Sequence, residues 1–268
     1  MKKITCLLFL TLLFLSSCSS DTTTSAPQDD VLVNEVWSDS DTDPIHFIYD
    51  GKKIVSASHP YEDRYYTYTG DLITKIQTFG NGNGLPYGLR TEDIFTYDTN
   101  GRLIEHIFKF TPDAINIIDV ITTTFVYNSA NTVSTTKMHE YTDVGITRLE
   151  ETRIIHLSGT RIASEDISLY DAGGNLGYSY TINYNYDTKN NPFKNVIGYN
   201  QIFLAEECVF SFDQLRHLHN IISTQEINGS NAITVTYTYN DLDFPLTAAE
   251  SYVSEPGLPP TMTHYLYY

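Results

Sequence analysis

The sequence is poor in cysteine, in tryptophan and in long apolar runs. Its three cysteines are Cys6, Cys18 and Cys208. If the chain is cut before Cys18, as argued below, Cys208 remains as the only free thiol and no disulfide within the chain can form. A single thiol is more often a small core side chain than a nucleophile. No run of about 20 apolar residues follows position 18, so no transmembrane helix is predicted.

Basic residues are also scarce. The chain carries 16 Lys and Arg against 33 Asp and Glu, a formal net charge of −17. Loss of Lys2 and Lys3 with a leader peptide leaves 14 basic against 33 acidic residues, a formal charge of −19. Such a surface repels nucleic acid and anionic lipid, so no nucleic-acid partner is expected.

The first residues have the order that export requires. Lys2 and Lys3 precede an apolar run from residue 4 to 15, which is too short to span a bilayer. The following Leu15-Ser16-Ser17-Cys18 resembles the lipobox of bacterial lipoproteins. That resemblance implies cleavage before Cys18 and acylation of this cysteine, whose lipid would be the membrane partner. An ordinary signal peptide with a chance cysteine is the alternative, and Cys6 has no apolar run before it.

Three regions follow from this interpretation. Residues 1–17 are a signal peptide, residues 18–30 a lipidated, flexible, polar tether, and residues 31–268 a single domain. Ser19, where lipoproteins kept in the inner membrane would carry Asp, indicates an outer-membrane location. The domain could face either the periplasm or the cell exterior.

A repeat dominates the remaining chain. Twenty-one tyrosines and thirteen phenylalanines, with abundant Thr, Ile and Val, favour β-strands. The pattern aromatic-x-Tyr followed by a polar turn is fullest at residues 95–104, and Ile155-His156-Leu157 is a degenerate copy. Its centres fall 26 to 30 residues apart, at positions 68, 97, 127, 157, 186, 212, 239 and 267. Such a steady period indicates one repeated supersecondary unit.

That unit is a β-hairpin. Phe95 and Tyr97 share one face of a strand, and Asp98 with Asn100-Gly101 supplies the turn. Seven or eight such hairpins predict an all-β, antiparallel up-and-down meander of about 14–16 strands. So many strands in an open sheet would leave exposed edges, and some strands carry apolar residues on both faces. We therefore expect the meander to close or curl into a large, possibly flattened, barrel.

The hairpin motifs resemble two known groups. Residues 97–103 (YDTNGRL) resemble the YD repeat of RHS-type bacterial proteins. Residues 190–193 (NNPF), residues 240–245 (NDLDFP) and the aromatic strand at 265–268 resemble a group of uncharacterised Bacteroidetes outer-membrane lipoproteins with a porin-like β fold. This second resemblance covers roughly residues 45 to 268. It implies architecture and no activity, because the group has no established chemistry.

Four stretches suggest metal, phosphate or acid–base sites, and each has a plainer interpretation. Residues 39–43 (DSDTD) look like a calcium loop, but Pro44 stands where Gly is needed. His217 and His219 lack a spaced third zinc ligand. The loop 80–86 (GNGNGLP) is not followed by a helix pattern that could hold phosphate. Adjacent pairs such as Glu150-Glu151 and Glu206-Glu207 should point to opposite faces of a strand. No catalytic residue, metal or cofactor is predicted.

Two further features stay open. Rows of tyrosine could bind glycans, but their fixed place in the repeat favours cross-strand packing. Residues 193–205 lose the two-residue alternation, and Phe193, Val196, Ile197 and Leu204 could form one face of a short helix.

The leading hypothesis is a non-catalytic envelope lipoprotein with a binding or structural role, whose partner could be a glycan or another envelope protein. A glycan-binding surface lipoprotein linked to polysaccharide uptake is the first alternative, and a hydrolase of extracellular polymers the second. A membrane-spanning barrel fits less well, because Thr122, Thr124 and Val126 on one strand face, with Thr236 and Thr238 elsewhere, make a polar band.

Overall fold

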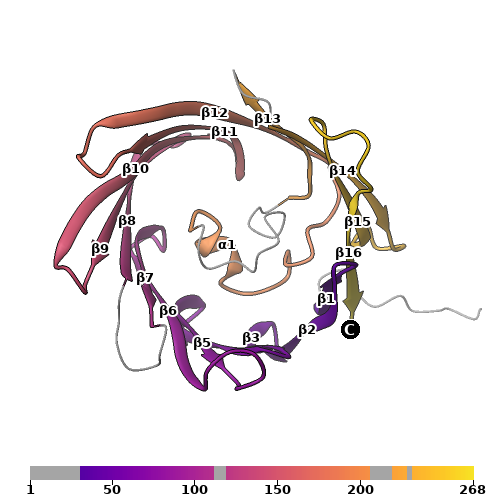
Figure 1. The fold of residues 1–268 in the computed structure, drawn as a ribbon. Helices are drawn as coiled ribbons and strands as arrows, with labels where there is room; N and C mark the ends of the chain where they lie inside the picture. The colour runs from indigo at the N-terminus through magenta and orange to yellow at the C-terminus, as the bar shows by residue number, and fades with distance from the viewer. Residues whose placement is uncertain (1–30, 112–118, 206–218, 228–230) are drawn as a thin grey trace, which may run out of the picture.

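A computed structural model describes residues 31–111, 119–205, 219–227 and 231–268. Sixteen antiparallel strands form a closed barrel in which each strand pairs with the next and β1 pairs with β16 (Figure 1). The strands are β1 Val33–Ser38, β2 Asp41–Asp50, β3 Lys53–His59, β4 Glu62–Thr69, β5 Leu72–Gly80, β6 Gly88–Tyr97, β7 Leu103–Phe110, β8 Asp119–Ser129, β9 Thr132–Tyr141, β10 Ile146–Ser158, β11 Arg161–Tyr170, β12 Leu176–Tyr186, β13 Ile221–Ile227, β14 Ala232–Tyr239, β15 Pro245–Tyr252 and β16 Thr261–Tyr267. The predicted meander and its closure are confirmed.

The repeat explains the turns at one end of the barrel. At the β6–β7 turn, Asp98 accepts hydrogen bonds from the backbone N–H groups of Asn100 and Arg102, at 2.8 and 3.0 Å. Gly101 takes φ +75° there, a conformation that costs glycine little. The pairing slips by one residue beside this turn, where Tyr97 faces Leu103. Equivalent slips lie beside Tyr49, Tyr68 and Tyr127, so the bulge belongs to the repeat.

The inner face of the wall carries the core. The first aromatic residues of three repeat copies, Phe47, Phe95 and Phe125, point inward and are buried. Leu103 and Val133, on the returning strands, are buried beside them. The expectation that Phe95 and Tyr97 share a face is met, and that face looks into the barrel.

The outer face is mainly polar. Thr124 and Thr136 pair across β8 and β9, and Thr236 and Thr238 are exposed on β14. Hydroxyl groups also bond from strand to strand on this face, as Thr238 does with Thr247 at 2.7 Å. Apolar outward residues are interrupted by polar neighbours: His46 lies beside Ile48, Thr124 beside Val126, and His264 beside Leu266.

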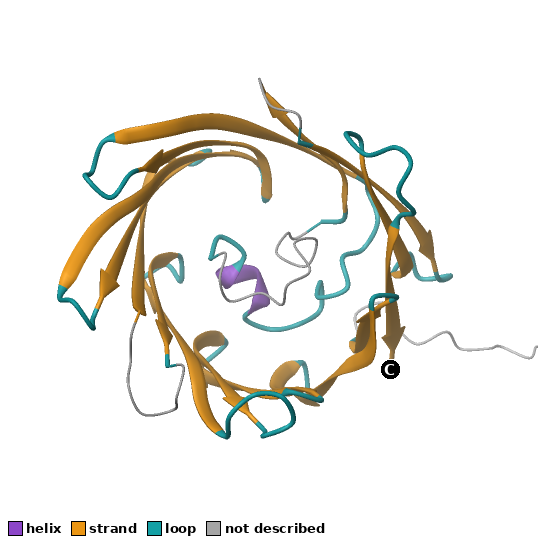
Figure 2. Cartoon of the chain, in the orientation of Figure 1, coloured by secondary structure: helices purple, strands orange, loops and turns teal. Residues whose placement is uncertain are grey.

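A segment between β12 and β13 enters the barrel. We call residues 187–205 the plug segment. It contains α1 Tyr199–Ile202, the one helix among the described residues, and lies inside the ring of strands (Figures 1 and 2). The predicted helix over 193–205 is thus a single turn. Phe193, Val196 and Leu204 are buried as expected, and Ile197 is half-buried.

Hydrogen bonds fix the plug segment to the wall. Asn190 Nδ2 donates to the Leu242 carbonyl at 2.8 Å, and the Ile197 N–H donates to the Lys52 carbonyl at 2.9 Å. The Phe193 ring meets Phe47 edge-on at 5.4 Å and stacks on Tyr199 at 4.4 Å. The motif at 190–193, in the plug segment, therefore lies against the motif at 240–245, in the turn before β15, and holds the plug segment there.

Helices of the length and apolarity needed to cross a membrane do not occur in the parts of the chain that the structure describes.

Candidate binding site in the barrel interior

The repeat tyrosines form a hydrogen-bonded ring inside one end of the barrel. Five of the described hydroxyls donate to a backbone carbonyl near the start of a strand from an earlier hairpin. These bonds join Tyr49 to Val33 (2.8 Å), Tyr97 to Ile73 (2.5 Å), Tyr127 to Leu103 (3.0 Å), Tyr186 to Ile162 (2.8 Å) and Tyr267 to Pro245 (2.8 Å). Tyr68 instead donates to the Ile197 carbonyl of the plug segment, and Tyr239 to the Asp187 carboxylate. Several acceptors, including Ile73, Leu103 and Ile162, flank the bulges, where regular strand pairing slips. The packing interpretation of the repeat tyrosines is therefore confirmed at these positions.

We expect Tyr97→Phe to lower the free energy of unfolding by about 1 kcal/mol, because the Ile73 carbonyl loses a partner at a half-buried position. Tyr65→Phe is a matched control, since Tyr65 faces outward and is 50% exposed. Urea unfolding followed by circular dichroism measures both. Equal effects of the two variants would show that the inward hydroxyl contributes nothing.

Burial also changes the ionisation of the ring. It raises the pKa of Tyr68 to about 12 and raises the pKa values of Tyr49 and Tyr267 well above the ordinary range. A tyrosine in the unfolded chain has a pKa of about 10. The folded chain thus holds protons that the unfolded chain releases above that pH, so stability falls as pH rises from about 10 towards 12. We expect the tyrosinate absorbance to increase and the β-sheet dichroism to decrease over the same pH range. If the two signals changed at different pH values, ionisation of these tyrosines would not be coupled to unfolding.

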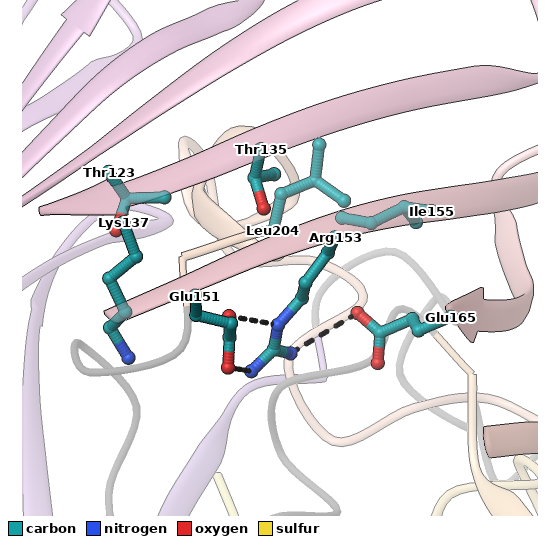
Figure 3. A pocket seen from close by; sticks show the side chains of 8 residues that line it. All are labelled: Thr123, Thr135, Lys137, Glu151, Arg153, Ile155, Glu165 and Leu204. Carbon is teal, nitrogen blue, oxygen red and sulfur yellow. Dashed lines mark hydrogen bonds and ion pairs between the residues drawn. The ribbon is translucent and has the colours of Figure 1, made fainter. Parts of the chain in front are cut away.

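A charged cluster lies on the inner wall beside the plug segment (Figure 3). Arg153 on β10 forms a two-pronged ion pair with Glu151, in which Nη2 lies 2.7 Å from Oε2. Its Nη1 lies 3.5 Å from Oε1 of Glu165 on β11, and Glu165 accepts a hydrogen bond from the Tyr184 hydroxyl. Glu151, Arg153 and Glu165 are 7%, 9% and 0% exposed. One guanidinium is thus shared by two carboxylates, in a pocket that Leu204 of the plug segment also lines.

A second cluster is centred on His139 of β9. His139 Nε2 is 2.8 Å from Asp119, and its Nδ1 is 2.5 Å from Glu150. Burial lowers the pKa of His139, but hydrogen bonds and charge from Glu150 and Asp119 outweigh it, so the net pKa is raised. Tyr141 stacks on the imidazole with ring centroids 3.9 Å apart.

Glu150 corrects one expectation. Glu150 and Glu151 were expected on opposite faces of a strand. The pairing with β9 shifts between Leu149 and Glu151, so Glu150 is the extra residue of a bulge. Its carboxylate turns inward to His139, on the same face as Glu151. The alternation rule fails here because a bulge inserts one residue without a partner.

The other predicted positions are scattered. Asp39 sits in the β1–β2 turn and pairs with His264 at 2.7 Å, as a solvated turn would. His219 lies in a bend before β13, with its ring edge against Tyr186. The loop 80–86 is held by Asn81, whose amide donates to the Pro60 carbonyl at 2.8 Å.

The remaining predicted residues cannot be placed. Cys18, Cys208, His217 and the pair Glu206-Glu207 lie outside the described residues. Within the described ranges, no group of three or more His, Cys, Asp or Glu side chains is arranged to hold a metal ion.

The fold is that of the porin-like β-barrels. A porin-like protein from Bacteroides vulgatus superposes with a TM-score of 0.58 at 16% identity, over 89% of this chain and 99% of that chain. One from Bacteroides uniformis gives 0.50 at 11% identity, over 89% and 96%. At such low identity the likeness concerns fold alone. The sequence matches no model of a known protein family, and no curated protein matches it.

Proposed function

We propose that this chain is an outer-membrane lipoprotein, anchored through lipid on Cys18, whose barrel stands outside the lipid phase and has a non-catalytic binding or structural role. The observation that carries the proposal is the polar outer wall. A strand that faces lipid presents an apolar band. Here the outer faces of β8, β9 and β14 carry rows of threonine and serine instead.

The interior supports the same proposal. The inner wall packs on the plug segment through Phe47 and Phe193. The buried carboxylates Glu151 and Glu165 are engaged by Arg153, which leaves them poor candidates for acid–base work. Likeness to porin-like proteins of Bacteroides adds support for an envelope location. The tether at 18–30 would span at most about 45 Å from the lipid to the barrel.

Metabolic labelling with an alkyne-bearing fatty acid, followed by fractionation, tests the anchor. The wild-type chain should take up label and need detergent for release, and Cys18→Ser should lose the label and be recovered without detergent. Cys6→Ser is the matched control and should behave as the wild type does. A Cys18→Ser protein that folds but stays in the membrane until detergent is added would contradict the proposal.

Glycan binding is the second candidate function. It is favoured by exposed tyrosine side chains that do not belong to the hydrogen-bonded set of repeat tyrosines. Tyr61 and Tyr87 are 40% and 78% exposed. Tyr87 belongs to the loop between β5 and β6, where its ring lies close to Gly82, and the Tyr61 ring lies close to Gly84 of the same loop. Flat rings of this kind stack on sugar faces. Affinity electrophoresis on a polysaccharide panel should show retardation that Tyr61→Ala and Tyr87→Ala abolish and that Tyr252→Ala, also exposed, leaves intact.

A further inference from the structure

A cavity of about 300 Å³ lies between the plug segment and the turn end of the barrel wall. Leu103, Tyr127 and Leu157 line it from the wall, and Gln201, Phe203 and Leu204 line it from the plug segment. A cavity of this volume lies at the lower end of the size range of small-molecule sites.

The cavity coincides with the one degenerate copy among the described repeats. Tyr97, Tyr127 and Tyr186 each reach a carbonyl 24 residues earlier in the chain. Leu157 occupies the equivalent position and, with neither ring nor hydroxyl, cannot bond the Val133 carbonyl in this way. Leu157 is itself one of the residues that line the cavity. The repeat therefore departs from its own pattern where the cavity lies.

The cavity walls select for chemistry. Leu103, Leu157, Phe203 and Leu204 present hydrocarbon, and the Tyr127 ring adds an aromatic face. Thr160, Asn200 and Gln201 are the uncharged polar residues of the lining.

Charge recognition is not available at this cavity. The one cationic side chain that lines it, Arg102, lies 4.5 Å over the Tyr127 ring and is paired with Asp98 at 2.7 Å. The chain as a whole carries a formal charge of −17, which disfavours anions. The described residues that line the cavity include no Asp or Glu to hold a cation, so an uncharged ligand is the best match.

We propose that this cavity binds a small, uncharged, aromatic or branched apolar molecule. The site is independent of how the chain is anchored, so failure of either proposal leaves the other standing.

Indole and benzothiophene test this site, because both are small, uncharged aromatic molecules of nearly the same shape. Titration of the purified chain from residue 19 onward, which contains every strand of the barrel, should show that each of them binds at millimolar concentration or below. Absence of indole binding at millimolar concentration would overturn the proposal.

Leu157→Tyr tests the location. Restoring the repeat residue should fill the cavity and weaken binding of both molecules at least tenfold. Circular dichroism checks that the variant is folded, and Leu157→Phe provides the same bulk without a hydroxyl if the tyrosine variant fails to fold. Ile154→Phe, on the outward face of the same strand and 43% exposed, should leave binding unchanged. Unchanged indole affinity in a folded Leu157→Tyr or Leu157→Phe protein would place binding elsewhere and overturn the proposal.

Discussion

Replacing Arg153 with methionine should lower the free energy of unfolding by about 3–5 kcal/mol. The reason is the pair of carboxylates that remains. Glu151 and Glu165 are almost fully buried, and the Arg153 guanidinium provides positive charge to both. Removing one partner of a buried ion pair leaves desolvated charge without compensation, which costs more than the pair itself contributes.

Two comparisons sharpen this test. Lys189→Met breaks the ion pair with Asp243, which is as short at 2.6 Å but has side chains 40% and 51% exposed, and should cost no more than about 1 kcal/mol. Combining Arg153→Met with Glu151→Gln and Glu165→Gln should recover much of the lost stability. Urea unfolding gives all three values. A cost below 1 kcal/mol for Arg153→Met alone would mean that the cluster is well hydrated.

Phe193→Ala should be comparably damaging, at about 3–5 kcal/mol, because it empties a fully buried site. The ring contacts Phe47 on the wall and Tyr199 in α1, so its loss frees the plug segment from both. We expect limited proteolysis to cut the variant within residues 187–205 while β-sheet dichroism is retained. Ile48→Ala, beside Phe47 but outward and 53% exposed, is the matched control and should change stability by less than about 0.5 kcal/mol.

If Phe193→Ala lost its sheet dichroism together with the plug contacts, the wall would depend on the plug segment for its own stability. A protease pattern identical to the wild type would show that the hydrogen bonds of Asn190 and Ile197 suffice to hold the segment.

The wall of the barrel could be predicted from the sequence because its determinants are local. Phe95, Tyr97 and the turn at 98–101 specify one hairpin, and the period repeats it around the ring. Closure followed from the number of strands. Bulges beside the tyrosines were not predicted, since they depend on which carbonyl a hydroxyl finds 24 residues away.

The interior site was largely out of reach of sequence reasoning. Arg153 and Glu165 are twelve residues apart on adjacent strands, and no local sequence pattern links them. The plug segment was detected only as a loss of alternation near Phe193, and nothing local showed that it turns inward. Leu157 is the exception, because a degenerate copy of a regular repeat can be read from the sequence as a place where the wall changes.

The backward reach of Tyr97, Tyr127 and Tyr186 also bears on the order in which the chain assembles. Each of these tyrosines completes its hydrogen bond to an earlier hairpin only when its own hairpin forms, so structure can grow stepwise from the N-terminus. Each addition spans about two dozen residues and carries a small loop-closure cost. The final step is different, since β1 must wait for β16, with Val33 meeting Tyr267. Until then the first strand is an unpaired edge, and mispairing with a second molecule is the chief risk during biogenesis.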